Sequence, residues 1–342
     1  MVESVVKNVV KKVVIVSPAL ERENNGNWQT ASRWAHFLGE RYDVSIARAW
    51  TPDLPPPDLL IALHARRAAP SLAAFTEAWP GRPSVLVLTG TDLYRDIAVD
   101  QDARASLRRA GALVVLQDAG LALLPPDTRP KARVIYQSAE TLAPYSHAQD
   151  RRILPITMVG HLRPEKDPLT FIAAASLVTS PKARMVHIGG ALDAALGAQA
   201  AQAAQTANPR YRWLGNLAHG VTRQRLRRSH AMVIASRMEG GANVIIEAVT
   251  SGVPVLASDI SGNRGMLGED YAGFFPVGDA CALARLIDRS IIDAAFYQRL
   301  KAQCAARAAL FAPKAEQAAV LGLVDNLLES PPRHPSQEEK TS

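Results

Sequence analysis

The feature that most constrains the fold is a series of short apolar runs alternating with helix-like stretches, which restarts once along the chain. Most runs lack polar and apolar alternation, which is typical of parallel strands buried on both faces. A polar, irregular break at 141–155 separates the two series. The first series predicts strands at Val13–Ser17, Val44–Ala47, Leu59–Leu63, Val85–Thr89, Leu113–Leu116 and Arg133–Tyr136. The second predicts strands at Ile156–Gly160, Met185–Gly189, Tyr211–Leu214, Met232–Ala235, Val255–Ser258 and Gly273–Pro276.

Helical patterns fill the spaces between these runs. Two consecutive β-α-β series joined by a linker indicate an α/β chain of two Rossmann-like, doubly wound domains, 1–150 and 151–330. We expect the last helix to pack back on the first domain and the Pro- and charge-rich segment 331–342 to be disordered. The expected helices are 28–40, 69–78, 102–110, 119–123, 168–178, 193–207, 222–229, 243–251, 280–290, 294–309 and 315–328.

Composition agrees with a soluble two-domain protein. A length of 342 residues suits about two domains, and 48% hydrophobic with 21% charged residues excludes a disordered or collagen-like chain. No apolar run approaches the roughly 20 residues of a membrane span. Lys7, Lys11 and Lys12 interrupt the N-terminal apolar stretch, so a signal peptide is not expected. With only two cysteines, these features predict a cytoplasmic location and no stable membrane association.

The net charge of +7 points to anionic partners. Arg supplies 30 of the 39 basic residues, and guanidinium groups suit phosphate. The densest basic cluster has no interleaved aromatic residues, unlike a typical nucleic-acid surface. We therefore expect small anions rather than nucleic acid as ligands. This cluster consists of Arg223, Arg225, Arg227 and Arg228.

The most informative motif runs from Ser236 to Glu247, between an expected strand and an expected helix. Small residues allow a ligand to approach the backbone, and free N–H groups at a helix start attract phosphate. Glu239 would then bind sugar hydroxyls, and Glu247, about 9 Å along the helix from Gly241, would bind ribose hydroxyls. The pattern favours a nucleotide-sugar site over a plain loop. The small or capping residues of this motif are Gly240, Gly241, Ala242 and Asn243.

A second motif, Gly160-His161-Leu162-Arg163-Pro164-Glu165-Lys166-Asp167, follows the first strand of the second series. Arg163 and Lys166 could stabilise a departing diphosphate, because negative charge builds on its oxygen. The plainer interpretation is a surface turn with Asp167 as a helix N-cap.

Three loops of the first domain also follow strands, and so would face a cleft between two facing domains. Asn24-Asn25-Gly26-Asn27 has turn chemistry. His64 could shuttle a proton or hydrogen-bond an anion. Arg66, Arg67 and Arg95 could hold a second anion, or could equally form ordinary ion pairs with Asp92 or Asp96.

Several enzyme classes lose support. No His, Cys or carboxylate group has metal-ligand spacing, and the phosphate loop, the nucleophile elbow and the dinucleotide fingerprint are all missing from the sequence. Hydrolase, kinase and dehydrogenase functions are therefore disfavoured, and we expect neither a metal nor a cofactor.

These motifs together resemble the GT-B glycosyltransferases of family 4. The resemblance implies two domains facing a central cleft, with Glu239 on the donor sugar and Glu247 on the ribose. Lys166 matches the family's phosphate-binding lysine. His161 stands where the family has arginine, with Arg163 close by in sequence, and Asn25-Gly26-Asn27 replaces the family's Gly-Gly loop.

A closer resemblance, over nearly the whole chain, is to the selenosugar synthases of selenoneine biosynthesis (SenB type). The matching strings include 63–67, 88–96, 160–164, 208–215, 236–243 and 267–271. The resemblance implies that UDP-GlcNAc and selenophosphate react to form a carbon–selenium bond and release UDP. We expect His64, Lys166 and Glu239 to be the catalytic residues. The expected donor-binding residues are Gly160, His161, Arg163, Lys166, Glu239, Gly240, Gly241, Ala242, Asn243 and Glu247. As a hypothesis from their charge and hydrogen-bonding groups, the residues expected to bind selenophosphate are His64, Arg66, Arg67, Thr91, Arg95 and Asn27.

Three other functions fit the same residues. A family 4 transferase would use a hydroxyl acceptor, an epimerase on this fold would consume UDP-GlcNAc without an acceptor, and a sensor would bind the donor without releasing UDP. The sequence leaves the sugar, the anomeric outcome and the oligomeric state open.

Overall fold

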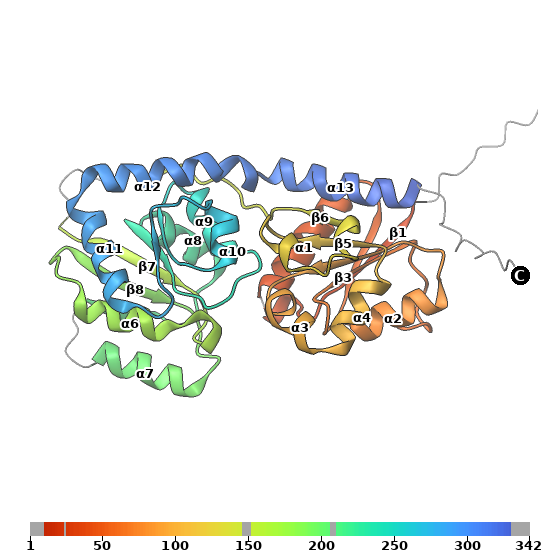
Figure 1. Ribbon diagram of the computed structural model, residues 1–342, viewed down its shortest axis with the longest axis horizontal. Coiled ribbons are helices and arrows are strands. Elements are labelled where there is room, and N and C mark those ends of the chain that lie inside the picture. The colour runs from red at the N-terminus through yellow and green to blue at the C-terminus, as the bar shows by residue number, and fades with distance from the viewer. Residues whose placement is uncertain (1–9, 24, 146–151, 206–209, 330–342) are drawn as a thin grey trace, which may run out of the picture. The chain divides into compact units, whose positions relative to one another are not determined.

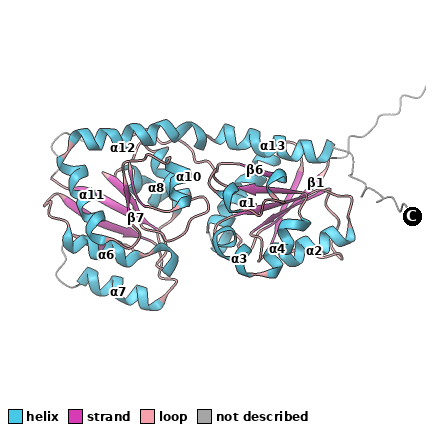
Figure 2. Ribbon diagram, viewed as in Figure 1, coloured by secondary structure: helices cyan, strands magenta, loops and turns pink. Residues whose placement is uncertain are grey.

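A computed structural model describes residues 10–23, 25–145, 152–205 and 210–329 (Figures 1 and 2). The contacts divide the chain into two compact units. The first comprises Met1–Leu116, Leu121–Ile135 and Glu316–Ser342, and the second comprises Gln117–Gly120 and Tyr136–Ala315. The expected domain boundary at 150/151 and the tail 331–342 lie outside the described residues.

The first unit is built on a six-stranded parallel sheet of order β2-β1-β3-β4-β5-β6. Strands β3 and β4 are buried along their whole length, as their unbroken apolar sequences predict. The strands are β1 (Lys12–Val16), β2 (Asp43–Ala47), β3 (Leu59–Leu63), β4 (Ser84–Leu88), β5 (Ala112–Val115) and β6 (Ala132–Val134).

Helices cover both faces of this sheet. Side chains alternate across a strand, so Leu60 and Ala62 pack on α2 and α4, whereas Leu59 and Ile61 pack on α1 and α13. The helices of this unit are α1 (Gly26–Leu38), α2 (Ala69–Ala78), α3 (Ile97–Val99), α4 (Gln101–Arg109), α5 (Gly120–Leu123, whose first residue belongs to the second unit) and α13 (Pro313–Glu329).

The helix α13 is tied to α1 by a buried carboxylate. Glu316 accepts hydrogen bonds from Arg33 Nε at 2.6 Å and Trp34 Nε1 at 2.8 Å. Val320 and Val324 of the same helix are fully buried against the sheet. From Glu316 onward, α13 is therefore part of the first unit although it is last in the sequence.

The second unit has its own six-stranded parallel sheet, of order β12-β11-β10-β7-β8-β9. Numbered from β7, this is the 3-2-1-4-5-6 order of dinucleotide-binding folds. The strands are β7 (Leu154–Val159), β8 (Ala183–Ile188), β9 (Tyr211–Trp213), β10 (Ala231–Ile234), β11 (Val255–Ser258) and β12 (Phe274–Phe275).

One continuous apolar core, which includes Phe171, Ile245 and Leu283, joins this sheet to its helices. Both units thus confirm the expected α/β architecture of two Rossmann-like domains. The helices of the second unit are α6 (Pro168–Leu177), α7 (Ala194–Gln205), α8 (His219–Arg227), α9 (Asn243–Val249), α10 (Ser261–Leu267), α11 (Ala280–Ile292) and α12 (Ala294–Arg307).

Candidate functional site

The chain order of the second sheet reverses between β7 and β10, which are neighbours but not consecutive. Loops at the carboxyl ends of two such strands diverge and leave a place for a ligand. The segment Gly160–Asp167 follows β7, and the segment Ser236–Ala242 follows β10. The fold therefore brings together the two motifs expected to bind the donor.

An ion pair joins the two loops directly. Lys166 Nζ donates to Glu239 Oε1 at 2.5 Å, and the two side chains are only 17% and 10% exposed. Burial removes water from both charges, so each charge must be compensated by the other. Each group is thus set beside the other before any ligand binds.

The backbone carbonyl of Gly160 is fixed by contacts with β8 and the residue that follows it. His187 Nε2 donates to the Gly160 carbonyl at 3.0 Å, and burial lowers the pKa of His187 to about 4, so this ring is neutral. A Cβ at Gly189 would lie 1.9 Å from the same carbonyl oxygen. Close backbone packing therefore fixes the turn that opens the first motif.

His161 is a neutral donor at this edge. Its Nδ1 accepts the Gly190 N–H at 3.1 Å, which places the ring proton on Nε2. Burial, with Arg163 and Lys166 nearby, lowers its pKa. The Nε of Arg163 is buried and lacks a hydrogen-bond partner in the part of the chain that the structure describes. Because His161 is neutral, the positive charge of this motif is supplied by Arg163 and Lys166.

Asp167 precedes α6 at its N-cap position, but its side chain does not cap the helix. The residue is in the left-handed region at φ 45°, and its carboxylate instead meets Arg237 Nη2 at 3.0 Å. The Arg237 N–H also donates to the Glu165 carbonyl at 2.9 Å. These contacts fasten the second motif to the first.

The expected small residues complete the loop after β10. Gly240 is buried and Gly241 half-buried, Ala242 occupies the N-cap of α9, and Asn243 begins the helix. Helix α10 supports this loop, because a Cβ at Gly262 would lie 2.0 Å from the Glu239 carbonyl oxygen. The sequence motifs did not predict α10.

Glu247 lies in α9, as expected, and is 8% exposed. It accepts from His219 Nε2 at 2.6 Å, and this bond raises the pKa of His219. His219 opens α8, 28 residues earlier in the chain. Sequence reasoning missed this residue, since no local motif connects it to Glu247.

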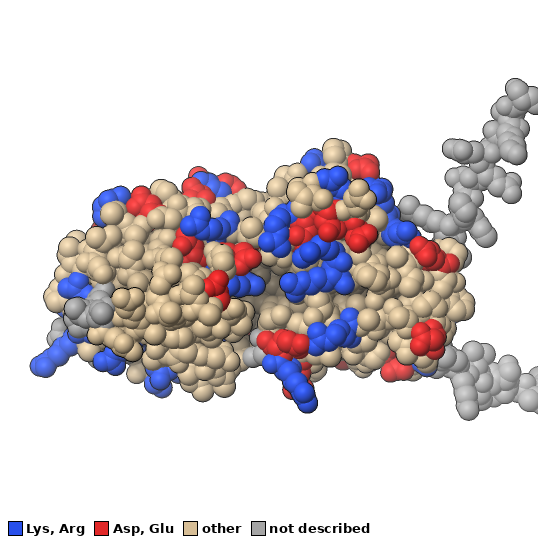
Figure 3. All heavy atoms as spheres, turned by 90° about the horizontal axis from the view of Figure 1, so that it is seen from below, with Lys and Arg blue, Asp and Glu red and all other residues tan. Residues whose placement is uncertain are grey.

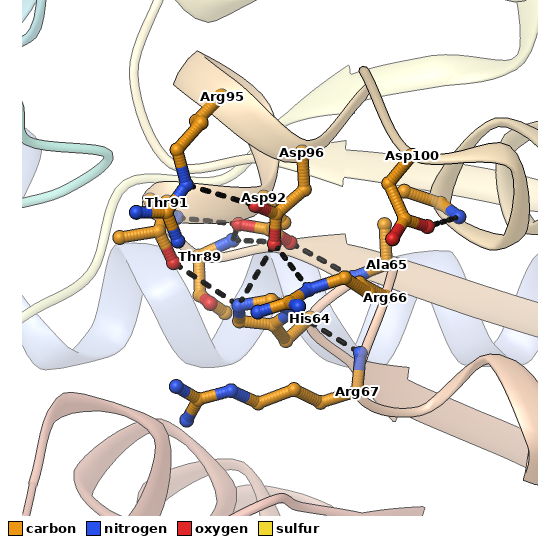
Figure 4. A network of polar contacts seen from close by, with 12 residues as sticks. His64, Ala65, Arg66, Arg67, Thr89, Thr91, Asp92, Arg95, Asp96 and Asp100 are labelled. Atoms are coloured by element: carbon orange, nitrogen blue, oxygen red, sulfur yellow. Dashed lines mark hydrogen bonds and ion pairs between the residues drawn. The ribbon is translucent and has the colours of Figure 1, made fainter. Parts of the chain in front are cut away.

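The first sheet also reverses its chain order, between β1 and β3. His64 directly follows β3 and adopts φ 76°, a backbone region that a non-glycine residue rarely occupies. It is 2% exposed. Strain of this kind gathers at ligand sites, and a network of polar contacts surrounds the residue (Figure 4).

Asp92 organises the backbone of that network. Its carboxylate accepts the N–H groups of Ala65 at 2.9 Å, Thr89 at 3.0 Å and Gly90 at 2.8 Å. It is completely buried at the start of a π-helical turn, η2 (Asp92–Asp96). Asp92 therefore joins the loop after β3 to the loop after β4.

Asp96 orients two arginines. It accepts from Arg66 Nε at 2.9 Å and Arg95 Nε at 3.1 Å, while the carboxylate itself is 4% exposed. Both arginines are held through Nε, and their side chains remain 43% and 48% exposed. Ion pairing and anion binding are thus compatible here, because each guanidinium also has two terminal nitrogens.

His64 is a hydrogen-bond donor in this network. Its Nδ1 accepts the Arg67 N–H at 3.3 Å, so its proton lies on Nε2, 3.1 Å from Thr91 Oγ1. Burial is the main cause that lowers the pKa of His64; Arg67 lowers it further, whereas Asp92 and Asp96 oppose the shift. A neutral ring with both nitrogens in hydrogen bonds is better suited to holding Thr91 and the Arg67 backbone in place than to transferring a proton.

The structure thus brings five of the six expected acceptor-side residues into one network. Arg67 is exposed, and its guanidinium makes no contact with the other residues drawn (Figure 4). Asn27 belongs to the first turn of α1, where its N–H donates to Asn25 Oδ1 at 3.0 Å.

Charge on the surface is mixed. On the face shown in Figure 3, Lys and Arg side chains alternate with Asp and Glu rather than forming one basic stripe.

Within the described ranges, no three His, Cys, Asp or Glu side chains are grouped so as to hold a metal ion. Over the same residues, every helix is too short or too polar to cross a membrane.

Comparison with known proteins places these sites in context. Residues 146–307 match the family model described as Glycosyl transferases group 1. No curated protein matches the sequence significantly. Among solved structures, sucrose-phosphate synthase from Thermosynechococcus elongatus is similar, with a TM-score of 0.74 at 17% identity over 93% of this chain and 99% of that one.

Two further structures contain nucleotides. HepE of Anabaena, in complex with UDP and glucose, has a TM-score of 0.71 at 16% identity over 92% of this chain and 100% of that one. The pneumococcal O-GlcNAc transferase GtfA, in complex with UDP and GlcNAc, has a TM-score of 0.62 at 17% identity over 80% of this chain and 57% of that one. The chain therefore has the fold of GT-B glycosyltransferases, and its residues 146–307 match the glycosyl transferases of group 1.

Proposed function

We propose that this protein transfers a sugar from a UDP-sugar, UDP-GlcNAc, to selenophosphate and so forms a carbon–selenium bond. The observation that carries the proposal is the network around His64, a set of anion-binding groups at the carboxyl edge of the first sheet. Its residues lie in the strings 63–67 and 88–96, two of those on which the resemblance to selenosugar synthases rests. The group 1 match and the geometry of the second unit support a nucleotide-sugar donor.

On the donor side, Glu239 would bind the sugar hydroxyls and Glu247 the ribose, since a carboxylate accepts well from a diol. Lys166 would leave Glu239 for the diphosphate when the donor binds. Its ammonium would then stabilise the negative charge that builds on the leaving oxygen. Arg163 and the neutral Nε2–H of His161 would bind the remaining diphosphate oxygens.

On the acceptor side, Arg66 and Arg95 would bind the phosphoryl oxygens of selenophosphate through their terminal nitrogens. Arg67 would add a third cation, and Thr91 a hydroxyl held by His64. A selenium nucleophile that is already deprotonated needs no general base. This agrees with the His64 ring, whose Nδ1 already accepts a hydrogen bond.

The chemistry balances in two steps. Selenium attacks the anomeric carbon, the carbon–oxygen bond to UDP breaks, and UDP leaves with the electron pair. Water then cleaves the Se–P bond, which gives phosphate and a sugar carrying the selenol. We assign no residue of this chain to the second step.

The experiment is an anaerobic assay of UDP release from UDP-GlcNAc, with the products analysed by mass spectrometry. Parallel reactions contain selenophosphate, thiophosphate, phosphate, a sugar alcohol or no acceptor. We expect a product with the selenium isotope pattern on GlcNAc only in the first. UDP release with a sugar alcohol but not with selenophosphate would support the hydroxyl-acceptor transferase instead, and turnover without an acceptor would support an epimerase or hydrolase.

A further inference from the structure

A cavity of about 950 Å³ lies in the first unit, and none of the residues of the His64 network lines it. It is bordered by residues that precede strands, such as Pro83 before β4 and Gly111 before β5. The His64 network follows strands β3 and β4. In a parallel sheet these are opposite edges, separated by the length of a five-residue strand, about 16 Å.

All charged side chains around this cavity are positive. Arg82 and Arg109 have partners elsewhere, in the Pro57 carbonyl and Glu77. The guanidinium of Arg108 has no hydrogen-bond or ion-pair partner among the described residues, and that of Arg133 has only a 3.5 Å contact with its neighbouring carbonyl. The five cations are Arg82, Arg108, Arg109, Lys131 and Arg133.

Lys131 is half-buried at the wall of the cavity. Its ammonium donates to the carbonyls of Arg108 at 2.9 Å and Ala110 at 2.7 Å. An ammonium has three donors, so one remains for a ligand. The cavity therefore combines a fixed cation with the exposed guanidinium groups of Arg108 and Arg133.

Another wall belongs to α13 and is mainly apolar. Leu323 and Leu327 line it together with Asn326, and Gly322 and two alanines precede them along the helix. Glycine inside a helix destabilises it relative to alanine, yet a Cβ at Gly322 would meet nothing within 4 Å. Packing within the described protein therefore does not require this glycine, whereas a ligand beside the helix would.

We propose that this cavity is a second ligand site, which binds a phosphorylated small molecule of nucleotide size. The volume is at the upper end of small-molecule sites and far exceeds that of a single phosphate. The cations would hold phosphoryl groups, and the wall at Gly322 and Leu323 would contact a planar or apolar body. The inference is independent of the proposed transferase reaction.

The test is isothermal titration of the full chain with ATP, with coenzyme A and with inorganic phosphate. We expect ATP or coenzyme A to bind, and phosphate to bind at least ten-fold more weakly. The double substitution Arg108→Ala with Arg133→Ala should weaken nucleotide binding at least ten-fold. Gly322→Leu, which places a bulky side chain at the wall of the cavity, should also weaken it at least ten-fold.

Two controls locate the binding. Arg299→Ala removes an exposed charge of α12 and should change the affinity less than two-fold. Glu247→Ala changes the expected donor site and should leave this binding intact. The proposal is overturned if neither nucleotide binds, if Arg299→Ala weakens binding as much as the double variant, or if only Glu247→Ala abolishes it. Should Gly322→Leu fail to fold, the arginine pair still decides.

Discussion

Lys166 Nζ and Glu239 Oε1 lie 2.5 Å apart, although the residues are 73 positions apart in the sequence. The contact crosses the point where the second sheet reverses its strand order, and it joins a cation suited to a diphosphate to a carboxylate suited to sugar hydroxyls. The two groups neutralise each other in the free protein. A donor that contacts both would therefore exchange one ion pair for two ligand contacts.

Lys166→Ala tests this exchange. Removing one preorganised group that stabilises developing charge lowers kcat by about 10² to 10³. We expect a loss of this size in UDP release, with partial recovery in Lys166→Arg, which restores the charge. The matched control is Lys182→Ala at an exposed position. Equal kcat values for Lys166→Ala and the wild type would exclude Lys166 from stabilising the leaving group.

Much of this arrangement could be predicted from the sequence. The unbroken apolar runs indicated buried parallel strands, and β3, β11 and α2 occupy their expected residues. The spacing of Glu239 and Glu247 predicted one carboxylate before a helix and one inside it, as observed. Local patterns suffice here because burial and helix periodicity are written in neighbouring residues.

The remaining features depend on contacts between distant segments. Helix α10 begins Ser-Gly-Asn-Arg-Gly, a poor helix former, and is stabilised by close packing of Gly262 on the Glu239 carbonyl. His219 reaches Glu247 only through the tertiary fold. The sequence suggested Asp96 as an ion-pair partner but not that it holds two arginines at once. The catalytic and binding roles of all these residues stay predictions.

The hydrogen bond between His219 and Glu247 should have a measurable effect on the pKa of His219. This bond raises the pKa of His219 above the usual histidine value of about 6.5. The pair therefore stabilises the fold fully below pH 6.5 and loses that contribution as the pH rises through the folded pKa. An NMR titration of the His219 ring should give a pKa above 6.5 in the wild type and a lower one in Glu247→Gln. Glu269→Gln is the control, because Glu269 pairs with Arg264 of α10, and it should leave the pKa of His219 unchanged. Equal changes of this pKa in both variants would contradict the assignment.

Arg66 is expected to bind the acceptor anion. Arg66→Ala should raise the KM for selenophosphate about ten-fold, since a charge-assisted hydrogen bond contributes about 1.5 kcal/mol or more. The KM for UDP-GlcNAc should not change. Arg41→Ala removes an exposed ion pair with Asp325 and serves as the control. Full turnover by Arg66→Ala at limiting selenophosphate would remove this residue from the acceptor site.

Asp96 should act through the two arginines it holds. Asp96→Asn keeps the size of the side chain but weakens both charge-assisted bonds, so Arg66 and Arg95 lose their fixed geometry. We expect a higher KM for selenophosphate with kcat reduced less, because binding rather than leaving-group chemistry is affected. A purely structural role would instead lower the thermal midpoint and disturb both substrates alike, which differential scanning calorimetry and the UDP-GlcNAc KM would reveal.

Removing the buried carboxylate of Glu316 should destabilise the first unit. Its side chain is fully buried and accepts from Arg33 and from the Trp34 indole. Glu316→Ala would leave both donors without their acceptor, and breaking a buried pair costs about 3 kcal/mol. Urea unfolding monitored by tryptophan fluorescence should show this loss, whereas Glu77→Ala, in an exposed pair with Arg109, should cost less than about 1 kcal/mol. If the two substitutions destabilise the unit equally, α13 is not fastened to α1 by this contact.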